Sequence, residues 1–227
     1  MKKVFFIIAW LFLSSLTFAQ TLKLQVGPSI SKLSWKDNFS QDRYDEQLVG
    51  FATSIGLDYL EKKHFNLSTG MVFLTKGGKG EQVINITQNP EDFSPLDPIP
   101  VIPTRLLLSH KPRLTYISIN TVFEYKFPIK EKWSPFLGAG PRFDYVIAKS
   151  EHFNELENAD AFNSASVGIL LAGGVKYQLS DLHLGIRCDH YLNFNDIADK
   201  PETAQNGGFT KVGDQTFILA LSLGCKL

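Results

Sequence analysis

The stretch LVGFATSIGLDYL, residues 48–60, alternates large apolar side chains with small or polar ones. Successive side chains of an extended strand point to opposite sides. One face therefore carries Val49, Phe51, Thr53, Ile55, Leu57 and Tyr59, and the other carries Gly50, Ala52, Ser54, Gly56 and Asp58. About ten residues with this period are the signature of a strand that crosses a membrane.

The same alternation recurs in seven further segments. Their ranges are 22–34, 65–76, 113–127, 135–149, 166–178, 182–195 and 216–227. Eight strands form the smallest bacterial transmembrane barrel, and its interior is just wide enough for side chains to fill. The sequence thus predicts an all-β fold, an eight-stranded antiparallel up-and-down transmembrane β-barrel.

The connections between these segments alternate in length. Those at 61–64, 128–134 and 180–181 are short, whereas those at 35–47, 77–112, 150–165 and 196–213 are long. Short turns on one rim and long loops on the other are typical of outer-membrane barrels, in which the short turns face the periplasm.

Composition agrees with this prediction. The 227 residues include 23 basic and 23 acidic side chains, with 44% hydrophobic residues and a mean hydropathy of −0.05. These values exclude a basic nucleic-acid binder, a polyacidic disordered chain and a polytopic helical membrane protein. The 18 phenylalanines and seven tyrosines favour β structure.

The first 19 residues read as a secretory signal. Lys2 and Lys3 precede an apolar run at 4–13, and Thr17-Phe18-Ala19 offers a cleavage site. Ten apolar residues are too few for a membrane-spanning anchor, which needs about 20. We expect a signal peptide at 1–19, a barrel domain at 20–227, and localisation in the outer membrane of a Gram-negative-type cell.

A soluble lipocalin-like barrel has the same periodicity. The second face distinguishes the two, because its Gly, Ala and Ser suit a cramped interior rather than a surface in water. Aromatic residues also gather near the strand ends, as a membrane interface requires. The set at the short turns is Tyr59, Phe65, Tyr125, Phe127, Trp133 and Tyr177, and that at the long loops is Phe73, Phe143, Tyr145, Tyr191 and Phe194.

Four segments resemble the PorT-like outer-membrane β-barrel family. They are the signal end Ala19-Gln20, FLGAGPRFDY at 136–145, LLAGGVKYQL at 170–179 and LHLGIRCDHYLNF at 182–194. The resemblance covers the mature chain and implies a small eight-stranded barrel. Some members are associated with protein secretion across the outer membrane. One departure is the final strand, which ends Cys225-Lys226-Leu227 rather than on an aromatic residue.

Eight charged residues fall on the small-residue face of the expected strands. They are Asp58, Lys76, Glu124, Arg142, Asp144, Lys176, Arg187 and Asp189. Buried charges need partners, because an unpaired one is costly. We expect a structural ion-pair network in the lumen. The alternative is a proton or ion path, which an eight-stranded barrel disfavours because it has no continuous water channel.

Some eight-stranded barrels are enzymes that modify lipids, so a catalytic site is a possible alternative. A serine nucleophile needs a histidine base nearby. None of the five histidines (His64, His110, His152, His183 and His190) precedes a serine by two residues, the spacing that shares a strand face. The sequence indicates no enzyme, no cofactor and no metal-ligand spacing. A lipid-modifying enzyme and, more weakly, a small pore remain the alternatives.

Cys188 and Cys225 both fall on the lipid-facing side of neighbouring strands. A cross-strand disulfide is geometrically allowed if the register places them opposite each other. The alternative is two free thiols that act as small hydrophobes.

The second long loop contains NPEDFSPLDPIPVIPTR, residues 89–105. Its candidate contact residues are Pro90, Phe93, Pro95, Pro98, Pro100 and Pro103. Dense prolines favour an extended polyproline-like conformation, which protein partners often bind. The alternative is a stiff loop that caps the barrel. The expected partners are outer-membrane lipid and a protein bound through the long loops, with no nucleic acid. The expected function is a structural or interaction protein of envelope secretion or assembly.

Overall fold

The computed structural model describes residues 21–37, 46–86, 104–127, 129, 132–150, 163–199 and 209–227. The strands are β1 (Thr21–Asp37), β2 (Glu46–Asp58), β3 (Phe65–Ile86), β4 (Thr104–His110), β5 (Arg113–Lys126), β6 (Trp133–Lys149), β7 (Ala165–Leu179), β8 (Leu182–Asn193), β9 (Ala198–Asp199) and β10 (Phe209–Lys226). Among these residues no helix is long and apolar enough to cross a membrane. The expected signal at 1–19 lies outside them.

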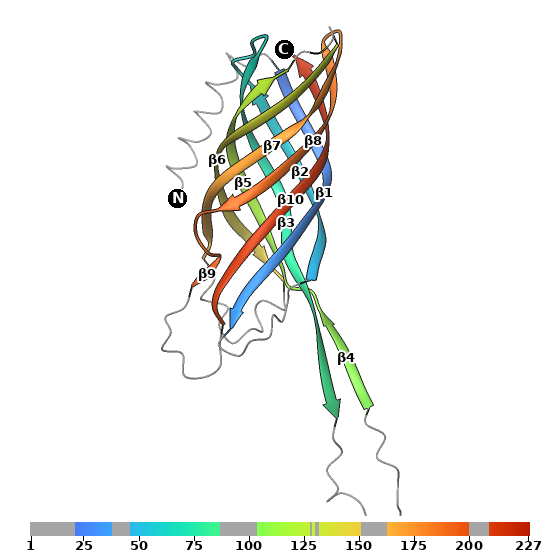
Figure 1. Ribbon diagram of the computed structural model, residues 1–227, viewed down its shortest axis with the longest axis vertical. Coiled ribbons are helices and arrows are strands. Elements are labelled where there is room, and N and C mark those ends of the chain that lie inside the picture. The colour runs from blue at the N-terminus through green and yellow to red at the C-terminus, as the bar shows by residue number, and fades with distance from the viewer. Residues whose placement is uncertain are drawn as a thin grey trace, which may run out of the picture.

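Eight of these strands close a barrel (Figure 1). Each pairs antiparallel with the next in the order β1-β2-β3-β5-β6-β7-β8-β10, and β1 pairs with β10 from Thr21↔Lys226 to Asp37↔Phe209. Closure leaves the barrel without a free sheet edge. The eight-stranded antiparallel barrel predicted from the sequence is confirmed, with strand ends that differ from the expected ones.

The outer face of the barrel is apolar. Phe51, Leu137 and Leu221 are 52%, 62% and 65% exposed, and large apolar side chains extend over all eight strands. An apolar surface of this extent marks a membrane interaction site. Leu57 departs from the pattern, because it has outward parity yet is only 2% exposed.

Aromatic rings surround the short-turn rim. Phe65 stacks on Phe123 with ring centroids 5.9 Å apart, and Trp133 meets Tyr177 at 4.8 Å. At the opposite rim Phe73, Phe143 and Tyr145 are exposed, as predicted. The expectation for Tyr191 was wrong. Its side chain is 1% exposed, because it shares the inward parity of Arg187 and Asp189 on β8.

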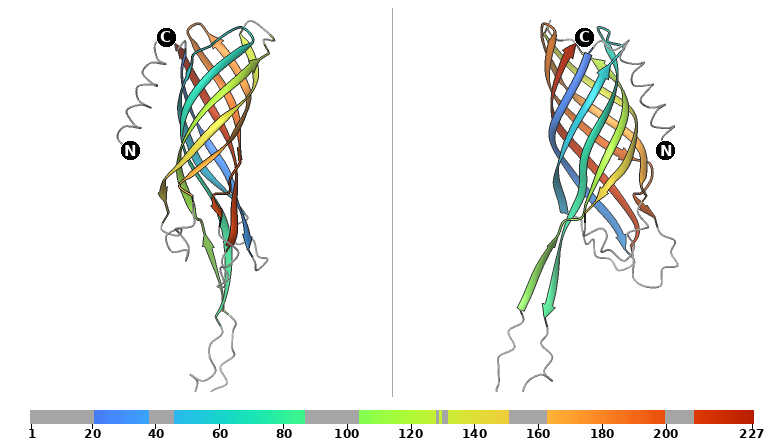
Figure 2. Two further views of the ribbon diagram at one scale, coloured as in Figure 1. Left: turned by 90° about the vertical axis from the view of Figure 1, so that its left-hand side faces the viewer. Right: turned by 180° about the vertical axis from the view of Figure 1, so that it is seen from behind.

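The largest departure from the sequence prediction is a hairpin that extends beyond the barrel. The segment 77–112 was expected to be one loop, but β3 continues to Ile86 and β4 pairs with it from Gly80↔His110 to Ile86↔Thr104. This β3–β4 ribbon projects from the end opposite the C-terminus (Figures 1 and 2). The final strand also begins earlier than expected, at Phe209, and pairs with the two-residue β9.

A bulge in β2 distorts the wall at the long-loop end. The β2–β3 pairing jumps from Gln47↔Gly78 to Ala52↔Leu74. In this gap β1 reaches β3 directly: the Ser29 hydroxyl donates to the Thr75 carbonyl (2.9 Å), and Ser31 Oγ accepts from the Gly77 amide (2.8 Å). The two serines thus satisfy backbone groups that β2 leaves unpaired.

Candidate functional site: the charged barrel interior

All eight charged residues expected in the lumen are buried in the barrel. Their exposed fractions run from 0% for Asp58, Glu124 and Asp144 to 9% for Lys176. The structure separates them into two groups. The Glu124 cluster comprises Lys23, Asp58, Glu124, Lys176, Arg187 and Asp189, and the Lys76 cluster comprises Lys76, Arg142, Asp144 and Asp214.

The Glu124 cluster is organised around one carboxylate. Lys176 Nζ donates to Glu124 Oε2 at 2.7 Å, and Arg187 Nη1 donates to Glu124 Oε1 at 2.5 Å. The Asn66 amide adds a third donor to Glu124 at 3.0 Å. Since Glu124 comes from β5 and its partners from β3, β7 and β8, this one side chain ties together strands from across the barrel.

Two further carboxylates complete this cluster. Asp58 lies 2.5 Å from Lys23 Nζ, and Asp189 accepts from Arg187 Nε at 2.7 Å. Three cations therefore face three carboxylates. The Phe136 ring lies under two of the cations, with its centroid 4.9 Å from Lys176 Nζ and 5.7 Å from the Arg187 guanidinium carbon, where the ring face attracts them.

Glycine makes room for that ring. A Cβ added at Gly174 would lie 2.9 Å from Phe136 Cε1 and 2.2 Å from the Ile186 carbonyl oxygen. A side chain at this position would therefore displace both the ring and the backbone of the neighbouring strand.

The Lys76 cluster is organised around a cation instead. Lys76 Nζ bridges Asp144 at 2.8 Å and Asp214 at 2.9 Å. Arg142 Nη1 contacts Asp144 at 2.9 Å, so two cations again face two carboxylates. Tyr116 and Tyr191 flank the cations, with Lys76 Nζ 4.7 Å from the Tyr116 ring centroid and the Arg142 guanidinium carbon 4.2 Å from that of Tyr191.

Two small cavities lie beside the Glu124 cluster. One, of about 20 Å³, is lined by Lys23, Asn120 and Asp189 among others, and one of about 10 Å³ lies beside Ala52 and Ile218. Each has room for about one water molecule. Apolar side chains of the core pack in the same interior, including Val72, Leu170 and Ile218. The described interior is thus filled by side chains.

Sequence reasoning missed two members of these clusters. Lys23 lies between the outward residues Leu22 and Leu24 of β1, so the alternation in the expected strand at 22–34 already indicates that its side chain points inward. Asp214 lay outside the expected strand at 216–227, which placed it in a loop. The early start of β10 brings it to Lys76.

A separate ion pair lies at the short-turn rim. Lys126 Nζ donates to Glu61 Oε1 at 3.2 Å, and the Thr21 hydroxyl donates to Glu61 Oε2 at 3.1 Å. Burial alone would raise the pKa of Glu61. The Lys126 charge and the two hydrogen bonds outweigh it, so the pKa of this carboxyl lies below its ordinary value.

The two cysteines are free thiols. The register explains this, since Cys188 lies opposite Leu219 and Cys225 opposite Leu182. Leu219 and Cys225 are six positions apart on β10, which is roughly 20 Å at 3.3 Å per residue. A disulfide requires Cα atoms within about 7 Å, so the disulfide that the sequence allowed does not form.

The proline-rich residues Pro90, Phe93, Pro95, Pro98, Pro100 and Pro103 lie outside the described residues. Within the described part of the chain, no three His, Cys, Asp or Glu side chains are grouped to hold a metal ion.

Comparison with known proteins places this geometry in a family. A family model described as "Outer membrane protein beta-barrel domain" matches residues 13–199. No curated protein matches. Similar solved structures include Neisserial surface protein A (TM-score 0.49, 14% identity, 91% of this chain and 97% of that chain). Another is OprG from Pseudomonas aeruginosa (TM-score 0.48, 13% identity, 92% and 97%). A third is the outer membrane enzyme PagL (TM-score 0.38, 14% identity, 89% and 99%).

The family model spans well over half of the chain, and the closed barrel with its apolar outer face agrees with it. This chain is therefore an outer-membrane protein that belongs to the outer membrane protein β-barrel domain family.

Proposed function

We propose that this protein is a non-enzymatic, non-conducting anchor in the outer membrane. Its long-loop end, including the β3–β4 ribbon and the proline-rich segment at 90–103, binds a protein partner. The process it serves is secretion across the envelope or assembly of the envelope. This is the function that the resemblance to the PorT-like family supports.

The observation that carries the proposal is the β3–β4 ribbon. Seven residue pairs, from Gly80↔His110 to Ile86↔Thr104, continue beyond the closed wall. A two-stranded hairpin is marginally stable by itself in water, and it offers backbone groups along its edges to a further strand. A bound partner strand would supply the pairing that the ribbon lacks.

The filled interior supports an anchor rather than a pore. Both ion-pair clusters are balanced in charge, and the cavities beside the Glu124 cluster hold about one water molecule each. Conduction would require several buried ion pairs to separate together, which is costly in a low-dielectric interior.

Crosslinked co-purification from outer membranes tests the proposal. We expect one protein to crosslink to the intact chain and to be lost from two variants. One lacks residues 90–103, and the other has residues 80–110 replaced by a two-residue turn. A variant that lacks 151–162, from another long connection at the same end, is the matched control and should keep the partner.

Three results would contradict the proposal. The first is equal capture by all variants, or capture of no protein. The second is discrete conductance steps of the purified barrel in planar bilayers, which would indicate a pore. The third is a change in acyl-chain masses in membrane lipids from an overproducing strain, which would indicate a lipid-modifying enzyme.

A further inference from the structure

Ionisable and amide side chains interrupt the apolar outer face where β1, β8 and β10 approach the long-loop end. On β1 the outward positions Leu24, Val26 and Ile30 are apolar, and the next outward position is Lys32. Gln215 lies opposite Lys32 on β10, and His190 of β8 lies opposite Phe217. A charged side chain on a lipid-facing surface is costly at the bilayer midplane and much less so near the head groups, so these residues indicate a head-group level on the barrel.

A cavity lies beside these residues, where β1 continues past its last partner on β2. Pairing between β1 and β2 ends at Ser31↔Leu48, whereas β1 remains paired with β10 as far as Asp37. Gln47, the next residue of β2 toward the long loops, pairs with Gly78 of β3 and lies past the end of the β1–β2 pairing. The wall therefore has a recess of about 140 Å³, lined by Ile30, Lys32, Gln47, His190, Gln215 and Phe217 among others.

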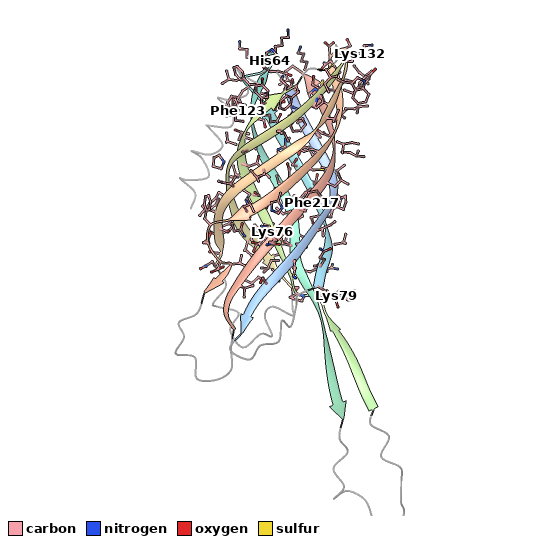
Figure 3. All side chains as sticks on the ribbon, in the orientation of Figure 1. His64, Lys76, Lys79, Phe123, Lys132 and Phe217 are labelled. Atoms are coloured by element: carbon pink, nitrogen blue, oxygen red, sulfur yellow. The ribbon has the colours of Figure 1, made fainter. Side chains whose placement is uncertain are left out.

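The lining combines two kinds of surface. Lys32, His190 and the amides of Gln47 and Gln215 carry N–H donors, and phosphate is an acceptor for which such donors are suited. Ile30 and Phe217 supply apolar walls, and Phe217, 39% exposed, is labelled on β10 in Figure 3. A ligand that fits has an anionic head and an apolar body.

The volume of the recess and its position on the barrel agree with such a ligand. A cavity of about 10–15 Å³ admits one water molecule, so a recess of about 140 Å³ has room for a group of several non-hydrogen atoms, such as one phosphate. The recess lies toward the long-loop end of the apolar face, where lipid head groups of the outer leaflet meet the barrel. A free anion would gain nothing from the apolar walls.

We propose that this recess, between β1, β2, β8 and β10, binds the phosphate head of a membrane lipid whose acyl chain lies over Ile30 and Phe217. The phosphate accepts hydrogen bonds from Lys32, His190 and the two glutamine amides. The site is independent of the protein partner proposed above, and a failure to find that partner leaves it standing.

Lipid retention measured by native mass spectrometry tests the site. The full-length protein is placed in phosphatidylcholine nanodiscs that contain equal amounts of phosphatidic acid and diacylglycerol, which differ only in the phosphate. We expect retained phosphatidic acid to exceed diacylglycerol by about tenfold or more, the range of one or two charge-assisted hydrogen bonds. Lys32→Gln and His190→Gln should each reduce this preference about tenfold.

Two further variants serve as controls for the role of the recess residues. Arg113→Gln removes an exposed cation at the same end of the barrel, on β5, and should leave the preference unchanged. Lys32→Arg should retain it, and a heat-dependent gel shift reports whether each variant is folded. Equal retention of the two lipids, or an equal loss in Arg113→Gln, would overturn the proposal. So would displacement of phosphatidic acid by excess inorganic phosphate, since that would indicate a site for free anions.

Discussion

The two ion-pair clusters inside the barrel have central residues of opposite charge. The Glu124 cluster places a carboxylate at its centre, where it accepts from Lys176, Arg187 and Asn66. The Lys76 cluster places a cation at its centre, between Asp144 and Asp214. Figure 3 shows Lys76 within the barrel, away from the short-turn end marked by His64 and Lys132.

The two arrangements predict different responses to loss of the central residue. Removal of Glu124 would leave three cations against two carboxylates and would take away the partner of several donors at once. Removal of Lys76 would leave the ion pair between Arg142 and Asp144 in place. Only Asp214 would lose its cation, and its carboxylate would still accept a hydrogen bond from the Thr216 hydroxyl at 3.3 Å. The carboxylate-centred cluster should therefore be the more sensitive to loss of its central residue.

The largest effect is expected for Glu124→Gln. We expect the free energy of unfolding to fall by about 3–5 kcal/mol, the usual cost of breaking a buried ion pair from one side. Urea unfolding in lipid vesicles, followed by tryptophan fluorescence, measures it. Lys79→Gln is the control, because its ion pair with Glu46 is exposed and should contribute less than about 1 kcal/mol.

A double substitution tests whether the charges of the Glu124 cluster are energetically coupled. Adding Lys176→Met to Glu124→Gln restores the balance of charge and should recover part of the lost stability. If the double variant is as unstable as the sum of the two single variants, the cluster does not act as a coupled unit.

A smaller effect is expected for Lys76→Met. We expect a loss of about 3 kcal/mol, at the low end of the same range, because Arg142 still pairs with Asp144. The same urea unfolding measures it, and Lys76→Met with Asp214→Asn should recover much of the loss. A larger loss for Lys76→Met than for Glu124→Gln would reverse the comparison.

The smallest effect is expected at the short-turn rim, for Glu61→Gln. Because the pKa of Glu61 is lowered in the folded protein, its ionised form stabilises the fold above the ordinary carboxyl pKa, and this contribution is lost as the pH falls through the lowered pKa. We expect a difference from the unsubstituted protein below about 1 kcal/mol near neutral pH that vanishes in acid. Unfolding measured across a pH series checks it, and a difference that grows in acid would contradict it.

Much of the barrel could be predicted from the sequence. The two-residue period assigned eight strands, and the parity of Asp58, Lys76 and Glu124 placed their side chains inside. At Tyr191 strand parity outweighs residue type: its parity with Asp189 makes it inward, although its aromatic ring suggested the membrane interface.

The ion pairs themselves could not be predicted. The Lys76–Asp214 pair joins β3 to β10, which are far apart in sequence, and which inward residues meet depends on the tilt and stagger of the closed wall. The β3–β4 ribbon was missed because a loop rich in proline masks the strands on either side of it. The recess beside Lys32 lies where the β1–β2 pairing ends, and alternation alone does not reveal that point.

By itself the sequence determined which side of each strand faces lipid, because a strand has only two faces and their hydrophobicity differs. Only the tertiary structure decided which buried charges neutralise one another and where the wall opens. Those outcomes depend on register, and one shift of register along a strand changes every neighbour across it.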